Sequence, residues 1–387
     1  MRMHSSHVVA PALVLVGILL HEAPAAGAFP RPAIAFEPRQ YLCAAVAVPP
    51  VIDGSLDDSA WDAAPWSDPF VDIEGPARPT PRFATRAKMI WDDRFFYVGA
   101  ELEEPHLWAT LRERDSVIYH DNDFEVFIDP DGDNHLYYEL EINALGTEWD
   151  LLLVKPYRDG APAVNAWDIQ GLRTAVSLEG TLNDPRDADA GWSVEIAIPW
   201  AVLAECAGRP SPPRPGDVWR VNFSRVQWDL EVEDGAYAKR LAAGGRPLPE
   251  HNWVWSPQGL IAMHYPEMWG EVMFMAGREA GPFDGSPEHL SIADAQALMP
   301  LYYAQREHHE RHGSFAGSLG ELVPLDPGLV LLEDPPRSRL RMHGQDDLFH
   351  AVLTTANGSF TIDKTGRLVR APLEGVPGPA GESGVRP

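Results

Sequence analysis

Two short runs of alternating residues, separated by a loop of spaced aspartates, constrain the fold of this chain more than any other segment. In residues 124–129 (FEVFID) the apolar side chains share one face of a strand and the acidic side chains share the other. In residues 139–143 (ELEIN) the same rule separates the leucine and isoleucine from the polar residues. The pattern predicts two strands with an apolar back and a polar front that carries Glu125, Glu141 and Asn143.

The loop between these runs places carboxylates at alternate positions, in Asp129, Asp131 and Asp133. Such carboxylates converge when the loop bends at Gly132, and oxygen ligands suit a hard cation such as calcium. The loop is not an EF-hand, because no helix is expected beside it and no glutamate follows at the twelfth position. The sequence therefore predicts a structural calcium site, with an ordinary Asp/Gly turn as the alternative.

Composition narrows the class of protein. The 387 residues are enough for two domains, and the 37 prolines favour a loop-rich β architecture because proline interrupts helix interiors. A formal net charge of -26 argues against nucleic acid and against an anionic membrane surface as partners. The charge is compatible with solubility alone, with calcium and with neutral ligands such as sugars.

The first residues are typical of an export signal. Arg2 precedes an apolar run at residues 8–20 that is too short to span a bilayer, and residues 26–28 (AGA) match a small-residue cleavage site. We therefore expect cleavage near Ala28 and a secreted or periplasmic protein without a membrane span, with an uncleaved anchor as the alternative. The two cysteines, Cys43 and Cys206, are free to pair in such a compartment, but the sequence leaves their pairing open.

Many short strands separated by polar, proline-rich or glycine-rich breaks fill residues 51–274. This spacing predicts a mainly β fold, an antiparallel β-sandwich of the immunoglobulin or jelly-roll kind. Residues 199–205 are expected to form a short helix, since proline is tolerated in a first turn. The clearest strand patterns are residues 86–91, 95–101, 192–198, 218–226 and 269–275. Tryptophans in phase with apolar strand positions are expected in the core: Trp61, Trp91, Trp192, Trp200 and Trp219.

The pattern changes after residue 277. A helix is expected from Ser291 towards His312, ended by Gly313, and a β-hairpin is expected around Asn357-Gly358. Together they predict a small C-terminal helix-plus-β-hairpin domain for packing or partner docking. The expected organisation is a signal peptide (1–28), a lead-in (29–47), the sandwich (48–276), the small α+β domain (277–371) and a disordered tail (372–387).

Four motifs in order give the sandwich a specific resemblance. They are VIDGSLDDSAW at residues 51–61, IWDDRFFYV at 90–98, DFEVFID at 123–129 and GWSVEIAIPW at 191–200. Residues 48–275 thereby resemble a family 9 carbohydrate-binding module, which belongs to a wider group of DOMON-like β-sandwiches. The resemblance implies an exported accessory of polysaccharide breakdown, with bound calcium and a sugar slot lined by aromatic rings.

The family's ligand-contacting residues match this chain unevenly. Glu125 matches the acidic sugar ligand, whereas Tyr119 stands where the family has a stacking tryptophan. The basic residue expected on the next strand falls near Glu141, which is a departure from the family pattern. For the second stacking ring, Trp255, His264 and Tyr265 remain open.

Residue chemistry supports sugar binding independently of the resemblance. Sugar rings stack their C–H faces on aromatic rings, and their hydroxyls need partners when they leave water. Trp149, Trp228 and Trp255 neighbour polar residues or proline in expected loops, so each is a ligand candidate, with packing under a loop as the alternative. The polar front, in turn, is either a ligand face or a solvated sheet face whose acids Arg86 and Lys88 neutralise.

Three functions follow in order of preference. The first is non-catalytic carbohydrate binding, with Tyr119, Glu125, Glu141, Asn143 and His264 among its residues. The second is a glycoside hydrolase, which needs two carboxylates at a set separation, here Glu125 and Glu141. The third is a haem-binding or redox domain, for which Met263 and His264 are axial-ligand candidates.

Overall fold

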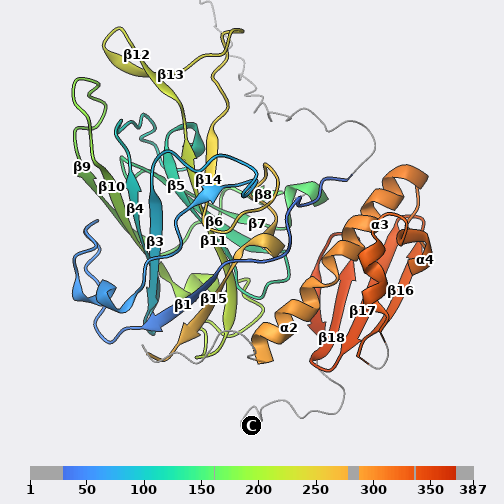
Figure 1. Ribbon diagram of the computed structural model, residues 1–387. Coiled ribbons are helices and arrows are strands. Elements are labelled where there is room, and N and C mark those ends of the chain that lie inside the picture. Colours follow the sequence, from blue (N-terminus) through green and yellow to red (C-terminus); the bar gives the residue numbers. More distant parts are fainter. Residues whose placement is uncertain (1–28, 161, 278–286, 335–336, 372–387) are drawn as a thin grey trace, which may run out of the picture.

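The computed structural model describes residues 29–160, 162–277, 287–334 and 337–371. It confirms the predicted fold class, a β-sandwich followed by a small unit of helices and strands (Figure 1). The expected signal peptide and C-terminal tail lie outside the described residues. Among the described residues, no helix has the length and apolar character needed to cross a membrane.

Thirteen strands form the sandwich, linked edge to edge in the order β8-β7-β6-β5-β11-β15-β1-β3-β4-β10-β9, with β14 and β2 attached beside β11. In chain order these strands are β1 (Gln40–Ala45), β2 (Val71–Asp72), β3 (Thr85–Trp91), β4 (Phe95–Glu103), β5 (Asp123–Asp129), β6 (Tyr137–Asn143), β7 (Glu148–Leu153), β8 (Ala163–Val164), β9 (Arg173–Glu179), β10 (Gly191–Pro199), β11 (Val218–Gln227), β14 (His251–Val254) and β15 (Gly270–Met275). A separate hairpin, β12 (Leu230–Glu233) and β13 (Ala236–Lys239), stands at one end of the sandwich (Figure 1). The short helix α1 (Trp200–Leu203) follows β10 as expected. Short 3-10 turns are η1 (Ser59–Ala63), η2 (Ile118–His120), η3 (Tyr157–Asp159) and η4 (Pro266–Met268).

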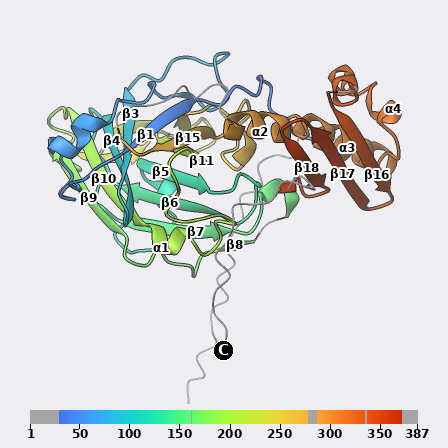
Figure 2. The ribbon, with the colours of Figure 1, turned by 90° about the horizontal axis from the view of Figure 1, so that it is seen from below.

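The sheet folds over on itself, so that its two halves face each other across one core (Figure 2). Val98 of β4 and Ile196 of β10 belong to the same buried cluster as Phe124 and Val126 of β5 and Leu140 of β6. The alternation of residues 124–129 and 139–143 therefore points its apolar side chains into this core, as predicted. β1 joins the halves by pairing in parallel with both β15 and β3, whereas the other pairings within the sandwich are antiparallel. The five tryptophans assigned to the core are all buried.

Two of the motifs that carry the family resemblance meet at a buried carboxylate. Glu195 of β10 accepts hydrogen bonds from the backbone N–H groups of Asp53 and Gly54, at 2.8 and 2.9 Å. Its other oxygen accepts one from Nε1 of Trp61, at 2.8 Å. The GWSVEIAIPW strand thus anchors the VIDGSLDDSAW turn, which accounts structurally for both motifs.

The C-terminal unit contains more structure than the expected helix and hairpin. The predicted helix is divided into α2 (Pro287–Gln296) and α3 (Met299–His312), and Gly313 ends α3 in a left-handed conformation as expected. The predicted hairpin corresponds to β17 (Leu348–Thr355) and β18 (Gly358–Asp363). It is extended to a four-stranded sheet by β16 (Arg339–Gln345) and β19 (Leu368–Ala371), and α4 (Leu319–Leu322) and η5 (Pro327–Leu332) complete the unit.

The sandwich and the C-terminal unit share buried contacts. Phe29, Tyr265 and Met268 lie in one apolar cluster with residues of α3, including Tyr302 and Tyr303. Beside this cluster, the guanidinium of Arg158 bonds both oxygens of Glu267, at 2.7 and 3.0 Å. The carboxylate of Asp159 accepts from the hydroxyl of Tyr302, at 2.7 Å. The C-terminal unit is therefore packed against the sandwich.

Cys43 and Cys206 are both free thiols in this structure. Cys43 is buried in the sandwich core, and burial raises the pKa of its thiol well above the ordinary value. The pairing that the sequence left open is thus not found.

Candidate binding face

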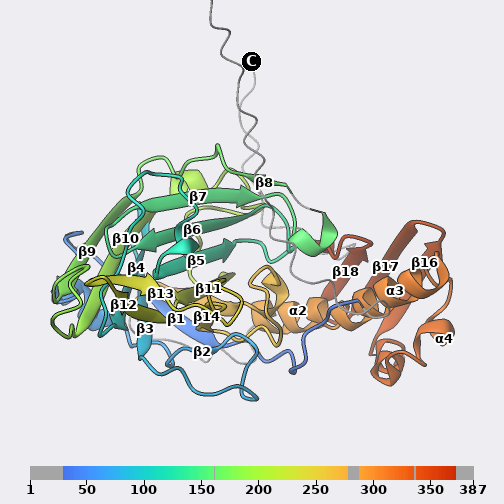
Figure 3. The same cartoon turned by 90° about the horizontal axis from the view of Figure 1, so that it is seen from above.

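Strands β5, β6 and β7 lie side by side and turn one shared face away from the core (Figure 3). Their register places Glu125 opposite Glu141, and Glu141 opposite Trp149 of β7. On the other side of β5, Ser224 of β11 lies opposite Glu125. Since directly opposed side chains on one face contact each other, the strand pairing brings these residues into one group, here called the acidic face.

The carboxylates of the acidic face are buried, whereas the sequence predicted either a ligand face or a solvated one. The exposed fractions are 0% for Asp123, 5% for Glu125, 6% for Glu139 and 2% for Glu141. Burying a carboxylate without a counter-charge is costly, so this arrangement needs a compensating group.

The expected neutralisation by Arg86 and Lys88 is wrong. Arg86 bonds Glu101 at 2.8 Å, and Lys88 donates to the backbone oxygen of Trp61. Both cations also lie over the ring of Trp66. They belong to the β3–β4 half of the sandwich, because the sheet folds over between β3 and β5.

Burial and mutual repulsion favour the protonated forms of these acids. Burial raises the pKa of Glu125 to about 7. Burial and then the charge of Glu125 raise the pKa of Glu139 and that of Glu141 well above the usual range. The same causes act on the pKa of Asp123. The acidic face therefore favours a ligand that brings protons or positive charge to carboxylate oxygens.

Aromatic rings border the acidic face. The rings of Tyr119 and Trp149 lie 6.4 Å apart, and both side chains are half-buried. Tyr157 is 51% exposed and packs edge-on against His264, at 4.4 Å. The hydroxyl of Tyr137 is 3.0 Å from Nδ1 of His264, and burial lowers the pKa of this histidine to about 3. His264 is therefore a neutral ring at neutral pH.

Trp149 lies in β7 rather than in the loop that was expected, and strand pairing gives it its place beside Glu141. Trp228 does lie after a strand, but its ring is 8% exposed and covered by Lys239, whose Nζ is 3.3 Å from the ring centroid. The indole of Trp228 donates a hydrogen bond to the backbone oxygen of Tyr119, so Trp228 helps to hold Tyr119 in position.

Two predicted ligand residues are held by contacts within the protein, although Asn143 lies opposite Asp123 on the same face as Glu141. Trp255 is 1% exposed and packs in the sandwich core against Tyr41 and Phe223, since the chain after β14 turns inwards. Asn143 is buried, and its amide bonds the backbone oxygen of Leu111 and a carboxylate while its oxygen accepts two turn N–H groups. We therefore correct both to structural residues.

The predicted calcium loop brings its three carboxylates together, with ligand oxygens within 4.8 Å of one another. Both oxygens of Asp129 accept backbone N–H groups, and Asp133 accepts from Nε of Arg367 at 2.8 Å. Burial and the neighbouring aspartate raise the pKa of Asp131 to about 6. The oxygen donor set suits calcium, although Arg367 already compensates part of the charge. The loop also contacts the C-terminal unit, because Leu368 donates to the backbone oxygen of Asp133.

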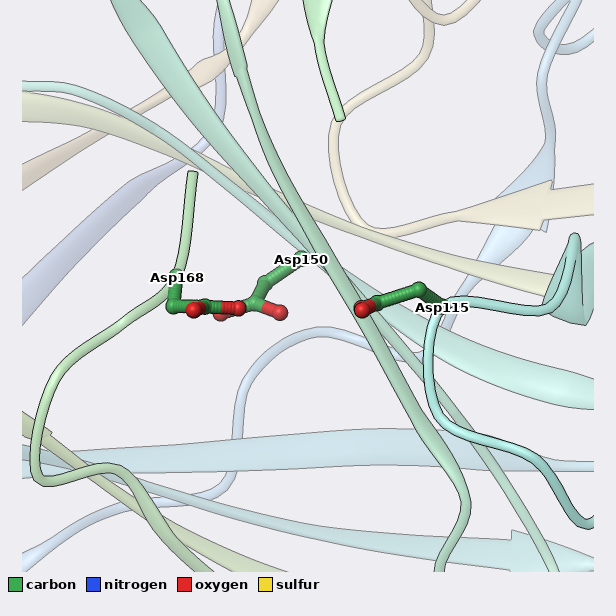
Figure 4. A group of neighbouring side chains, drawn as sticks. All are labelled: Asp115, Asp150 and Asp168. Atoms are coloured by element: carbon green, nitrogen blue, oxygen red, sulfur yellow. The ribbon is translucent and has the colours of Figure 1, made fainter. Parts of the chain in front are cut away.

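A further group of acids includes Asp150 of β7, which follows Trp149 and points to the opposite face of the strand. Figure 4 shows Asp115, Asp150 and Asp168 with their carboxylates directed towards one another. Arg114 forms ion pairs with each of them, so a cation is already present in this cluster.

Sequence reasoning did not assign Asp123 or Tyr157 to the binding face. Alternation placed Glu139 on the polar front together with Glu141, but Glu139 was not among the predicted ligand residues. Tyr157 comes from η3, and only the packing of that turn against His264 brings its ring to this face.

Residues 52–215 match the family model described as carbohydrate family 9 binding domain-like. Two curated relatives match at 28% identity. One is the exoglucanase XynX of Acetivibrio thermocellus, over 185 residues (48% of this chain and 13% of the relative). The other is the endo-1,4-beta-xylanase A of Thermoanaerobacterium saccharolyticum, over 159 residues (41% of this chain and 12% of the relative). The chain thus spans about an eighth of the length of these relatives.

Among solved structures, a family 9 carbohydrate binding module from Caldicellulosiruptor kristjanssonii in complex with glucose is similar to 64% of this chain over its full length. Its sequence identity is 18% and its TM-score is 0.41. Similarity at that level is too low to place a ligand in this chain.

Proposed function

We propose that this chain, whose residues 52–215 belong to the carbohydrate family 9 binding domain-like sequences, is a carbohydrate-binding protein that holds its ligand at the acidic face. The observation that supports this location is the pairing of half-buried aromatic rings with desolvated carboxylates. Trp149 stands beside Glu141 on adjacent strands, and Tyr119 packs against Trp149.

The chemistry of the face suits a polyhydroxylated ring. The C–H face of a sugar stacks on Trp149 or Tyr119, while its hydroxyl groups donate hydrogen bonds to Glu125 and Glu141. Hydroxyl donors favour the charged form of these carboxylates, which burial alone disfavours, and hydrogen bonds to a charged acceptor are strong. Since Glu141 stands where a basic residue was expected, the ligand of this chain contributes more donors than acceptors at that position.

The curated relatives suggest that this chain assists polysaccharide-degrading enzymes, although it matches only a small part of the length of those relatives. The printed names of those relatives are an exoglucanase and a xylanase. We propose that the chain acts without catalysis of its own, as an exported accessory that keeps an enzyme or a cell surface close to a polysaccharide. Its export rests on the predicted signal peptide.

A glycoside hydrolase remains the second candidate because Glu125 and Glu141 lie side by side with raised pKa values. However, these two carboxylates project from one face of one sheet, whereas hydrolases place them on opposite sides of the scissile bond. Release of reducing sugar that disappears in a Glu125→Gln variant would favour the hydrolase.

Calcium in the Asp129–Asp131–Asp133 loop is proposed as a structural ion. The fit of three oxygen donors supports it, and the loop's contacts with Arg367 and Leu368 give it a structural purpose at the junction of the two units. In this proposal, an Asp131→Asn variant loses part of the thermal stabilisation that calcium gives the wild type.

Binding is tested by a glycan array followed by isothermal titration with soluble oligosaccharides from plant cell walls. A Trp149→Ala variant should lose roughly two- to twelvefold in affinity, since stacking on an aromatic ring contributes about 0.5–1.5 kcal/mol and about 1.4 kcal/mol corresponds to tenfold. Trp66→Ala is the matched control, because Trp66 is half-buried but lies under Arg86 and Lys88 on the other half of the sandwich. An array without signal, or equal losses in both variants, would reject this face as a sugar site.

A further inference from the structure

Three carboxylates of the acidic face converge on one point. Asp123 and Glu125 of β5 and Glu141 of β6 each offer an oxygen, and these oxygens lie within 4.8 Å of one another. Calcium binds oxygens at about 2.3–2.6 Å, so oxygens on opposite sides of one ion lie about 4.6–5.2 Å apart. The three donors are therefore spaced to share one ion without any change in the strands.

A second observation concerns Asp123 alone. Its Oδ1 accepts from the backbone N–H of Val226 at 3.2 Å, whereas Oδ2 has no hydrogen-bond partner within the described chain although Asp123 is fully buried. A buried acceptor without a partner costs about 1–3 kcal/mol, and more when it is charged. An ion bound at this oxygen would remove that cost.

The charge balance points the same way. Across the described residues, no arginine or lysine forms an ion pair with Asp123, Glu125 or Glu141, and Glu139 and Glu250 add negative charge nearby. The neighbouring cations are engaged elsewhere, with Arg225 on Glu104 and Lys239 over the ring of Trp228.

The other two acidic clusters of the described chain differ in this respect. Arg114 forms ion pairs within the Asp115–Asp150–Asp168 cluster, and Arg367 forms an ion pair with Asp133 of the loop, so each cluster contains a compensating positive charge. The acidic face is thus the cluster whose charge the surrounding side chains leave uncompensated.

We propose that Asp123, Glu125 and Glu141 bind a divalent cation of calcium's size at the acidic face. Three monodentate carboxylates leave several of the 6–8 coordination positions of calcium to other oxygens. If the proposed carbohydrate function is correct, ligand hydroxyls occupy some of these positions, and the cation supplies the positive charge that the family's basic residue would otherwise bring.

The cation is tested on the full chain, first treated with a chelator and then titrated with calcium chloride at pH 7.5. The experiment is done in the wild type and in an Asp131→Asn background, in which the loop no longer contributes. Calorimetry should show one bound ion in that background, and the melting temperature should rise by several degrees as calcium is added.

Variants identify the ligands. Glu125→Gln and Glu141→Gln should each weaken calcium binding in the Asp131→Asn background at least tenfold. The matched control, Asp168→Asn, changes a cluster that already holds Arg114 and should keep the calcium-dependent rise. Terbium gives an independent readout, since an ion beside Trp149 is expected to show luminescence on tryptophan excitation that Glu141→Gln abolishes.

The outcomes separate this proposal from the carbohydrate function. Undiminished calcium binding in both glutamine variants, or no binding in the Asp131→Asn background, would overturn the cation site. Equal sugar affinity with and without chelator would reject the cation's part in sugar binding and leave the proposed function standing. Calcium binding with a silent glycan array would support the cation site and reject the carbohydrate function.

Discussion

Glu195 shows how one side chain fixes distant parts of the chain. Its two oxygens accept three hydrogen bonds, from the Asp53-Gly54 turn and from the indole of Trp61. The side chain is fully buried, and burial raises its pKa in spite of these donors. Gly54 has a φ of +93°, and an added Cβ would lie 2.6 Å from the backbone of Val176, so this turn requires glycine.

We predict that Glu195→Ala lowers the free energy of unfolding by about 3 kcal/mol, because three donors, two of them in buried hydrogen bonds, lose their acceptor. Urea denaturation followed by far-UV circular dichroism measures this change. Glu101→Ala, which removes a partly exposed carboxylate paired with Arg86, is the control and should change stability by less than about 1 kcal/mol. Similar losses in the two variants would contradict the anchoring role.

His264 is predicted to make the protein less stable in acid. Its folded pKa of about 3 lies below the ordinary value of 6.5, so the unfolded chain takes up a proton that the folded chain excludes. Stability from this group is present above pH 6.5 and is lost as the pH falls towards 3. The nearby carboxylates have raised pKa values, so their contribution to stability increases as the pH falls. The contribution of His264 to the pH dependence is therefore measured by comparison with a variant.

The comparison uses His264→Gln, whose amide retains hydrogen-bonding groups for Tyr137. Between pH 6.5 and 5 the variant should lose less stability than the wild type, by roughly 1.6 kcal/mol. His350→Gln, at an exposed position of β17, is the control and should follow the wild type. Parallel pH profiles for wild type and His264→Gln would disprove this assignment.

At the scale of elements, strand β15 begins with a glycine that lies against the ring of Trp255. Gly270 is its first residue, and an added Cβ would lie 2.2 Å from the ring of Trp255. Trp255 in turn packs against Phe223 of β11. The contact between glycine and indole thus allows the chain after β14 to place Trp255 in the core, where the sequence expected a ligand-contacting ring.

Gly270→Ala is therefore expected to destabilise the protein by about 2–3 kcal/mol, because neither the strand backbone nor the buried ring can move aside cheaply. Thermal unfolding measures the effect. Gly320→Ala provides a matched control in helix α4, where an added Cβ approaches nothing closer than 3.9 Å, and it should be neutral or slightly stabilising. A neutral Gly270→Ala variant would show that Trp255 can repack.

At the scale of the whole molecule, the C-terminal unit completes the surface of the sandwich. Tyr265 and Met268, which precede β15, are buried in a cluster formed mostly by residues of the C-terminal unit. Glu267, which lies between them, is fully buried and bonds both Arg158 and Tyr303. Without α3, this segment would expose apolar side chains and leave a buried ion pair partly unsatisfied.

A chain ending at residue 276 is predicted to melt several degrees below the full chain, since it exposes the apolar surface around Tyr265 and Met268. Differential scanning calorimetry measures both. Removal of residues 372–387 alone, the tail that the composition predicts to be disordered, is the control and should leave the melting temperature unchanged. An unchanged melting temperature after the larger truncation would mean that the sandwich folds independently of the C-terminal unit.

The strand alternation allowed much of the fold to be predicted. Residues 124–129 and 139–143 became β5 and β6 because a period of two fixes which side chains face the core. Strands near the ends of the sheets were harder to predict. Among those missed are β7, which lies next to the short edge strand β8, and β16, an edge strand of the C-terminal sheet. The segment of β7, EWDLLL, alternates too weakly to be told from a loop, and the first strand of the C-terminal sheet, RLRMHGQ, is mostly polar.

The candidate site was predicted in part, since Glu125, Glu141, Tyr119, Trp149 and His264 meet at one face. Asn143 lies on that face but its amide is bound within the protein, and Trp255 lies in the core. By itself the sequence determined the alternation, the family resemblance and the gathering of acids on one side of two strands. Only the tertiary structure decided that these acids are buried, and that Arg86 and Lys88 lie on the other half of the folded sheet. The reason is that alternation specifies a face of a strand, whereas the surroundings of that face, including its water and counter-charges, depend on segments far apart in the chain.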